Sequence, residues 1–356
     1  MKKMTSLERC MTVLNGDMPD TLPVVPQSFM LAVETAGFKI SEVNKNGKKM
    51  AQAHIISQAK YGYDGCVIDF DDASIAESVG AKVIFRDDAP AVVDEEQPVL
   101  KNLRDVYDLP MPDPYKSGRL CEWLEATRTL KEAIGDHVFI MGRADQGPFS
   151  IACLLRGTTQ FMMDLLSEDK KVIADVIDYC RKIGTIFAKA QKDAGANATS
   201  IGDALAGPNL ISPAMYREFA LEPERQMVHE VQNYGIPFSV HICGDTNDIN
   251  KDMGSTGAKI IEVDWKVDMA EARKVLPEST VLMGNIDPSD PLVIGTPADV
   301  DKAVKKLIYK TKGKNMFVSS GCAMGRDTPP ENFRAFISAG RKYGSYDEIM
   351  KLREHE

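Results

Sequence analysis

The chain has 356 residues, of which 44% are hydrophobic and 27% are charged, so it can bury a large core. Its formal net charge of −9 argues against a nucleic-acid-binding surface, which needs a basic stripe or patch, and favours a small-molecule or protein partner. The sequence has no apolar run of about 18 residues, no signal-peptide core behind Lys2 and Lys3, and seven scattered cysteines, so we expect a reduced, cytoplasmic protein without a membrane span.

Eight short apolar runs, most of them rich in β-branched residues and flanked by Gly, Pro or Asp, predict β-strands. They span residues 23–27, 65–70, 138–143, 198–202, 237–242, 259–263, 280–284 and 315–319. Helical patterns lie between most of these runs, at residues 48–61, 159–166 continuing through 170–193, 213–234, 269–276 and 298–311. Ser212 before Pro213 is typical of a helix start, and Gly235 is typical of the position just past a helix end.

The alternation of strands and helices, with no break in composition, predicts an α/β fold with one (β/α)8 TIM-type barrel as a single domain over residues 1–356. We expect an N-terminal helical extension, and a long, proline-punctuated elaboration at residues 84–121, between the second and third strands. A doubly wound open sheet is the competing architecture. Its dinucleotide-binding form lacks support, because no G-x-G-x-x-G motif follows the first strand.

The segment around His241 and Cys243 carries the strongest chemical signal. These residues are two apart at the C-terminal end of a predicted strand, so both side chains point to the same face. Cys322 ends the eighth predicted strand, and active sites of such barrels lie at the C-terminal strand ends. Two thiolates and an imidazole suit Zn²⁺, and three protein ligands leave the fourth position open, as in catalytic zinc sites. By spacing alone, a core histidine beside two unreactive thiols is the alternative.

Motifs along nearly the whole chain resemble the uroporphyrinogen decarboxylase superfamily, and in particular its methyltransferase branch. They are residues 5–9, 15–16 and 22–24 at the start, then 147–149 with 156–157, Asp203 with 211–213, Tyr216 and Phe219, 263–265 with 267–268, and 284–288. The resemblance implies a TIM barrel, in agreement with the eight predicted strands.

Two features separate this chain from the decarboxylases of that superfamily. The decarboxylases hold the carboxylates of a tetrapyrrole with an arginine-rich loop after the first strand, whereas residues 26–32 here contain no arginine. The decarboxylases also have a histidine where this chain has Cys322. His241, Cys243 and Cys322 instead match the H-x-C…C zinc motif of corrinoid-dependent methyltransferases.

The resemblance therefore implies a zinc-dependent methyltransferase that moves a methyl group between a corrinoid and a small substrate, such as a thiol or a methylated donor. Zinc would present a bound thiol as thiolate to a methyl–cobalt centre, or activate a methylated donor for attack by Co(I). The methylcorrinoid would arrive on a separate corrinoid-binding protein, because nothing in the sequence resembles a cobalamin-binding module. Metal-free decarboxylation of a tetrapyrrole and non-enzymatic corrinoid or thiol binding are the alternatives.

Six further side chains are candidates for roles around the metal. They are Glu262 as a fourth zinc ligand, Asp203 and Asp71 as catalytic or orienting groups, and Gln146, Arg143 and Asn285 as substrate-contacting groups. Glu262 could instead pair with a basic side chain, and Asp71 could instead cap the following helix.

Overall fold

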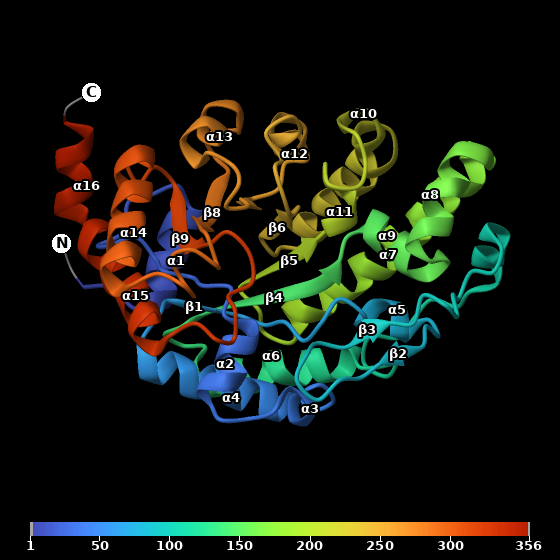
Figure 1. Ribbon diagram of the computed structural model, residues 1–356, viewed down its shortest axis with the longest axis horizontal. Helices are drawn as coiled ribbons and strands as arrows, with labels where there is room; N and C mark the ends of the chain where they lie inside the picture. The colour runs from blue at the N-terminus through green and yellow to red at the C-terminus, as the bar shows by residue number, and fades with distance from the viewer. Residues whose placement is uncertain (1–2, 355–356) are drawn as a thin grey trace.

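Seven parallel strands form one curved sheet in the structure, a computed structural model that describes residues 3–354. The strand order is β1-β4-β5-β6-β7-β8-β9, so each strand pairs with its neighbours along the chain apart from the β2–β3 pair inserted after β1 (Figure 1). The seven strands are β1 (Gly65–Val67), β4 (Phe139–Gln146), β5 (Ala198–Gly202), β6 (Phe238–His241), β7 (Ile260–Glu262), β8 (Val281–Ile286) and β9 (Met316–Ser320).

The first predicted strand, residues 23–27, lies between β9 and β1 but forms only an isolated parallel bridge from Val24 to Val318. The N–H of Val318 donates to the carbonyl of Pro23, and the N–H of Asp64 donates to the carbonyl of Val24, at 2.9 and 2.8 Å. The segment therefore connects the two edges of the sheet. It is too short to be a regular strand because prolines at 23 and 26 supply no N–H to a ladder.

Helices surround the sheet and confirm the predicted helical segments, with some changes at their ends. The predicted helix at 213–234 contains a π-helical turn, Tyr216–Ala220. The long helical pattern that begins at residue 159 forms two helices, one ending at Ser167 and the next beginning at Lys170. The helices are α1 (Ser6–Leu14), α2 (Phe29–Thr35), α3 (Ile40–Val43), α4 (Gly47–Tyr61), α5 (Ser74–Ser78), α6 (Leu120–Ile134), α7 (Pro148–Arg156), α8 (Thr158–Ser167), α9 (Lys170–Asp193), α10 (Pro213–Met215), α11 (Leu221–Asn233), α12 (Asn250–Ser255), α13 (Met269–Val275), α14 (Pro297–Thr311), α15 (Pro330–Tyr343) and α16 (Tyr346–Arg353). Within residues 3–354, none of these helices combines the length and apolar character that crossing a membrane requires.

The predicted elaboration between the second and third strands holds a small antiparallel pair, β2 (Val83–Ile84) with β3 (Val92–Val93), and a 3₁₀ helix, Leu103–Asp108. In Figure 1 this segment and α5 lie on the right-hand side, toward which β4 points. The elaboration therefore lies toward the C-terminal ends of the strands, where barrel active sites are found.

The interior of the barrel is apolar at its N-terminal end. Side chains that alternate along the strands meet there, and the N-terminal helix α1 adds Cys10, Val13 and Leu14 to them. The strand and loop members of this inner cluster are Val25, Val67, Phe139, Met141, Ala198, Ile260, Val281, Met283 and Phe317, and Phe29 at the start of α2 joins them. Helix α1, the predicted N-terminal extension, thus fills the bottom of the barrel.

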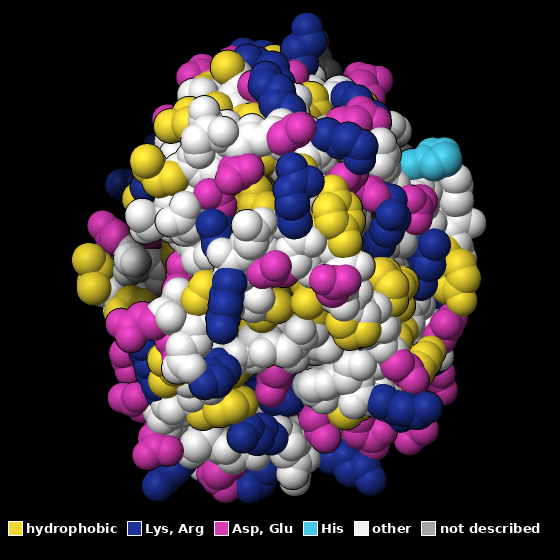
Figure 2. All heavy atoms as spheres, turned by 90° about the vertical axis from the view of Figure 1, so that its right-hand side faces the viewer, with side chains coloured by type: hydrophobic (Ala, Val, Ile, Leu, Met, Phe, Trp, Pro, Cys, Tyr) yellow, Lys and Arg dark blue, Asp and Glu magenta, His cyan; other side chains and the backbone are white. Residues whose placement is uncertain are grey.

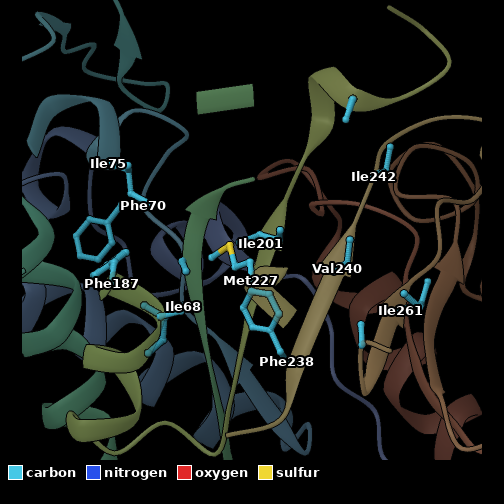
Figure 3. Close-up of a cluster of buried hydrophobic side chains, with 14 of the residues drawn as sticks. Ile68, Phe70, Ile75, Phe187, Ile201, Met227, Phe238, Val240, Ile242 and Ile261 are labelled. Atoms are coloured by element: carbon cyan, nitrogen blue, oxygen red, sulfur yellow. The ribbon is translucent and has the colours of Figure 1, made fainter. Parts of the chain in front are cut away.

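The opposite faces of the strands pack against the helices in a larger outer cluster. Figure 3 shows part of it, with Phe238, Val240 and Ile242 following one another along β6 and the segment after it. Because side chains alternate along a strand, Ser239, His241 and Cys243 face the interior of the barrel.

Above the apolar inner cluster, the next inward positions are polar. Arg143 follows Met141 by two residues, Glu262 follows Ile260, and Ser319 follows Phe317; all three polar residues are buried. The change from apolar to polar side chains along the same face of several strands creates a polar layer at the C-terminal mouth of the barrel.

A buried ion pair links α1 to the barrel wall and gives a test of the fold. The fully buried carboxylate of Asp64 accepts hydrogen bonds from Arg9 Nη1 at 3.0 Å and from the N–H of Val24 at 2.9 Å. The variant Asp64→Ala leaves Arg9 paired with Asp20 alone and the N–H of Val24 without this acceptor, so we expect the free energy of unfolding to fall by about 1–3 kcal/mol. Urea denaturation measures this, and Asp136→Ala, whose side chain is 97% exposed, should lose less than about 1 kcal/mol. Equal losses in the two variants would contradict the role of Asp64.

Candidate metal centre

The structure brings the three residues of the predicted zinc motif together. His241 ends β6 and Cys243 follows it by two residues, so both side chains face the interior, and Cys322 lies just after β9. The Nε2 atom of His241 is 3.1 Å from Cys243 Sγ, which is 3.9 Å from Cys322 Sγ. All three ligand atoms lie within 4.8 Å of one another. We refer to His241, Cys243 and Cys322 together as the metal group.

The imidazole of His241 is oriented by the main chain of the next strand. In the parallel register of β6 and β7, His241 stands opposite Glu262, and its Nδ1 lies 3.1 Å from the main-chain oxygen of Glu262. A neutral imidazole that donates Nδ1–H to this carbonyl presents the lone pair of Nε2 to the thiols. This is the orientation that metal-ligating histidines adopt.

The loop that carries Cys243 is held by a buried carboxylate. The N–H of Gly244 donates to Asp264 Oδ2 at 2.8 Å, and the N–H of Lys266 donates to Asp264 Oδ1 at 2.8 Å. Gly244 has a φ of +96°, a conformation that favours glycine. The turn immediately after Cys243 therefore depends on both Asp264 and Gly244.

The loop that carries Cys322 is held by close backbone packing. A Cβ atom on Gly321 would lie 2.3 Å from the main-chain nitrogen of Trp265, so a larger residue does not fit there. The N–H of Gly321 donates to the main-chain oxygen of Ile286 at 2.8 Å, and the N–H of Met324 donates to the main-chain oxygen of Gln27 at 2.9 Å. These contacts to three different segments position Cys322 opposite the β6 ligands.

The two thiols influence each other's ionisation. A hydrogen bond from the Cys322 thiol lowers the pKa of Cys243, while the same contact and burial raise the pKa of Cys322 to about 12. The contact thus favours ionisation of Cys243 over ionisation of Cys322. A bound dication would favour both thiolates, because a coordinating thiol is deprotonated.

Glu262, the predicted fourth ligand, has its carboxylate engaged elsewhere in the structure. Its Oε2 atom is 3.0 Å from Arg143 Nη2, and its Oε1 atom accepts a hydrogen bond from Ser239 Oγ at 2.9 Å. The structure therefore shows the alternative that the sequence left open, in which Glu262 pairs with a basic side chain, Arg143. A role as fourth ligand stays a prediction and would require Glu262 to leave these partners.

Arg143 lies in the polar layer next to the metal group. Its guanidinium pairs with Glu262 and, through Nε, with Asp69 at 3.1 Å, and Nη2 also lies 3.4 Å from Gln27 Oε1. The pKa of Arg143 is raised because these carboxylates outweigh the effect of burial. Arg143 therefore faces the mouth, as expected, although substrate contact itself stays a prediction.

Gln146 donates to Asp72 Oδ1 at 2.5 Å, at the end of β4. Neither Asp72 nor Asp69 was predicted from the sequence as a site residue, although both flank Asp71 in an acidic run that overlaps the end of a predicted strand. That run was the signal, but it did not indicate which carboxylate faces the barrel. Burial raises the pKa of both Asp69 and Asp72.

Asp71 itself has structural partners. Its Oδ2 atom is 2.5 Å from Arg119 Nη1, and its Oδ1 atom accepts from the N–H of Ala73 at 3.0 Å and from Ser74 Oγ at 3.2 Å. These contacts hold the turn before α5, but the N–H of Ile75 in the first turn of that helix donates to Asp145 Oδ2 at 2.6 Å, so Asp71 does not cap the helix as the alternative interpretation expected. A catalytic role for Asp71 stays a prediction without a contact in its favour.

Asp203 and Asn285 also use their side chains to hold backbone. Asp203 accepts hydrogen bonds from the N–H groups of Phe149 and Ser150, at 3.3 and 2.8 Å, and so caps α7. The Nδ2 atom of Asn285 donates to the carbonyls of Asp264 and Val267, at 3.0 and 2.7 Å. Their predicted catalytic and substrate roles are not supported by a contact with the metal group.

Curated relatives with similar sequences include methyltransferases over almost the full chain. The methylcobamide:CoM methyltransferase MtbA of Methanosarcina acetivorans is 28% identical over 348 residues, covering 96% of this chain and 99% of its own. MtaA of Methanosarcina barkeri, with the same activity in its name, is 27% identical over 349 residues. A uroporphyrinogen decarboxylase of Prochlorococcus marinus is 26% identical over 260 residues, or 71% of each chain.

Comparison of folds agrees with these relatives. A solved methyltransferase from Methanosarcina mazei superposes with a TM-score of 0.87 at 23% identity, covering 96% of this chain and 99% of the other. This likeness confirms the TIM-barrel fold. The family model for uroporphyrinogen decarboxylase (URO-D) matches residues 5–343. The chain therefore belongs to the uroporphyrinogen decarboxylase family.

Proposed function

We propose that this protein is a zinc-dependent methyltransferase that moves a methyl group between a corrinoid protein and a small thiol or methylated substrate. The observation that carries the proposal is the convergence of His241 Nε2, Cys243 Sγ and Cys322 Sγ from two separate strand ends. These strand ends lie at the mouth of the barrel, where this fold places its chemistry.

The three residues fit a zinc ion by donor type and by spacing. In a tetrahedral site with Zn–S bonds of about 2.3 Å and Zn–N bonds of about 2.1 Å, neighbouring ligand atoms lie about 3.6–3.8 Å apart. The Cys243–Cys322 separation of 3.9 Å is close to the expected value, and the His241–Cys243 separation of 3.1 Å would have to widen slightly around an ion. Two thiolates and one imidazole form a soft donor set that suits Zn²⁺ and leaves one position for substrate.

Bound zinc would supply Lewis acidity, either keeping a substrate thiol deprotonated or activating a methylated donor. The residues of the chain prepare the site for that chemistry. The carbonyl of Glu262 keeps His241 in the tautomer that offers Nε2, and Asp264 anchors the turn after Cys243. Gly321 lets the Cys322 loop pack closely against Trp265. Together these contacts hold all three donors before substrate arrives.

The full-length similarity to methylcobamide:CoM methyltransferases supports a methylated corrinoid as the second reactant. The corrinoid would be carried by a partner protein that approaches the mouth of the barrel. Figure 2 looks onto the right-hand side of Figure 1, the side toward which β4 points, and shows acidic, basic and apolar side chains interspersed there. A surface of mixed character is typical of non-obligate protein interfaces.

Tetrapyrrole decarboxylation is less favoured by the structure. Arg143, the guanidinium beside the metal group, is already paired with Glu262 and Asp69. A substrate with many carboxylates would meet further acidic groups at the mouth, including Asp72, and no compensating arginine in residues 26–32. The decarboxylase relative also matches a smaller share of the chain than the methyltransferases do.

The metal site can be tested by zinc analysis. We expect about one zinc per chain in the purified protein, and we expect His241→Ala and Cys322→Ser to weaken zinc affinity by more than about 100-fold, because each removes a direct ligand. Elemental analysis after dialysis against a chelator measures the loss. Cys121→Ser is the matched control, since Cys121 is also partly exposed but lies outside the metal group. A zinc-free wild-type protein, or zinc retained in both ligand variants, would refute the site.

The reaction can be tested with methylcobalamin and 2-mercaptoethanol as methyl donor and acceptor. Wild-type protein should demethylate the cobalamin, which the corrin absorption bands report, and Cys322→Ser should slow the reaction at least about 100-fold, because thiol activation depends on the metal. Cys121→Ser should react at the wild-type rate. Binding of both reactants without turnover would favour a regulator, and carbon dioxide release from uroporphyrinogen would favour a decarboxylase.

A further inference from the structure

An acidic wall formed by Asp69, Asp72 and Glu262 lies beside the metal group. The main-chain oxygen of Glu262 holds His241, and the side chain of Glu262 pairs with Arg143 at 3.0 Å. Asp69 pairs with the same guanidinium at 3.1 Å. Asp72 contacts the neutral amide of Gln146 at 2.5 Å. The wall is thus continuous with the β6–β7 side of the metal group.

The charge of this wall is not balanced by the contacts described for residues 3–354. Three carboxylates face one guanidinium, which leaves a formal surplus of two negative charges. The metal group does not compensate, because a zinc dication with two thiolates and a neutral imidazole has no net charge. Desolvation and the neighbouring carboxylates raise the pKa of Asp69 and Asp72, the direction expected where negative charges crowd together, although Asp69 is only partly buried and Asp72 reaches solvent.

Unpartnered polar atoms mark the same region. Asp69 Oδ1, a hydrogen-bond acceptor, is buried and has no hydrogen-bond partner, while Oδ2 of the same carboxylate pairs with Arg143. Asp145, only 1% exposed, has a partner for Oδ2 in the N–H of Ile75 but none for Oδ1. Asp145 precedes Gln146 at the end of β4, and its carboxylate interacts electrostatically with Asp72 and Asp69, so this oxygen belongs to the same end of the barrel. Buried polar groups without partners are rare and indicate where water or a ligand binds.

We propose that the non-corrinoid substrate carries a positively charged ammonium group, which binds to the acidic wall while its reacting group lies at the metal. The ammonium would donate hydrogen bonds to free carboxylate oxygens such as Asp69 Oδ1, and its charge would offset the surplus of the wall. This inference rests on the proposed function. The inference narrows the class of substrate to cationic thiols or methylated amines, and it disfavours anionic substrates such as thiols that carry a sulfonate.

A matched series of thiols tests the charge preference directly. Cysteamine, 2-mercaptoethanol and 2-mercaptoethanesulfonate share the frame HS–CH₂–CH₂–X, in which X is an ammonium, a hydroxyl or a sulfonate. Isothermal titration of each thiol into the zinc-loaded protein measures its Kd without any methyl transfer. We expect cysteamine to bind at least about tenfold more tightly than the sulfonate, with 2-mercaptoethanol between them, because unlike charges attract near a partly buried site.

Variants separate the acidic wall from the intrinsic acidity of the thiols. Asp72→Asn keeps an oxygen for the Gln146 amide but removes one charge, and Asp69→Asn removes another. Each variant should reduce the ratio of cysteamine affinity to sulfonate affinity at least about threefold. Because the same two thiols are used with wild type and variant, differences in thiol acidity cancel when the two ratios are compared. Asp136→Asn removes an equally charged group whose side chain is 97% exposed, and it should leave the ratio unchanged. Zinc content and melting temperature confirm that each variant is folded and loaded.

The possible outcomes distinguish this inference from the proposed function. Tighter binding of the sulfonate than of cysteamine, or a ratio that is the same in wild type and both wall variants, would overturn the ammonium inference and leave zinc-dependent methyl transfer intact. Failure of the zinc-loaded protein to bind any of the three thiols would contradict the thiol chemistry of the proposed function, and the inference with it.

Discussion

The pairing of β6 with β7 is the constraint on which the metal group depends. In this register His241 stands opposite Glu262, so Nδ1 meets a main-chain carbonyl and Nε2 turns toward the thiols. A slip of one residue would place Val240 inside the barrel and send the imidazole toward the helices. Ile260, two residues before Glu262, packs in the inner cluster and resists such a slip. Apolar packing at the bottom of the barrel thus controls ligand orientation at its mouth.

The same alternation explains why one end of the barrel is apolar and the other is polar. Inward positions near α1 carry Phe139, Val281 and Phe317, which exclude water and stabilise the closed sheet. Two to four residues further along the strands, the inward positions carry charged and hydroxyl side chains. These polar groups are tolerated because they pair across the barrel, as Arg143 on β4 does with Glu262 on β7.

Charge divides the mouth of the barrel into two parts. The thiols and imidazole form a group whose negative charge a dication would neutralise, and its loops are held by Asp264 and by the close packing of Gly321. The adjacent acidic wall keeps a surplus of negative charge and unpartnered oxygens. In the proposed function, the first part would hold the metal and the second would select the substrate.

From the amino-acid order alone, the strand pattern indicates a barrel, and the two-residue spacing of His241 and Cys243 places both on one face. Cys322 is 79 residues from Cys243 in the chain and could be grouped with it because parallel strands end at the same edge. The partners of Glu262 and Asp203, and the pairing of Asp71 with Arg119, could not be predicted, because another element supplies each partner. Only the folded chain decides those contacts, since ion pairs and caps depend on distances between side chains that periodicity does not encode.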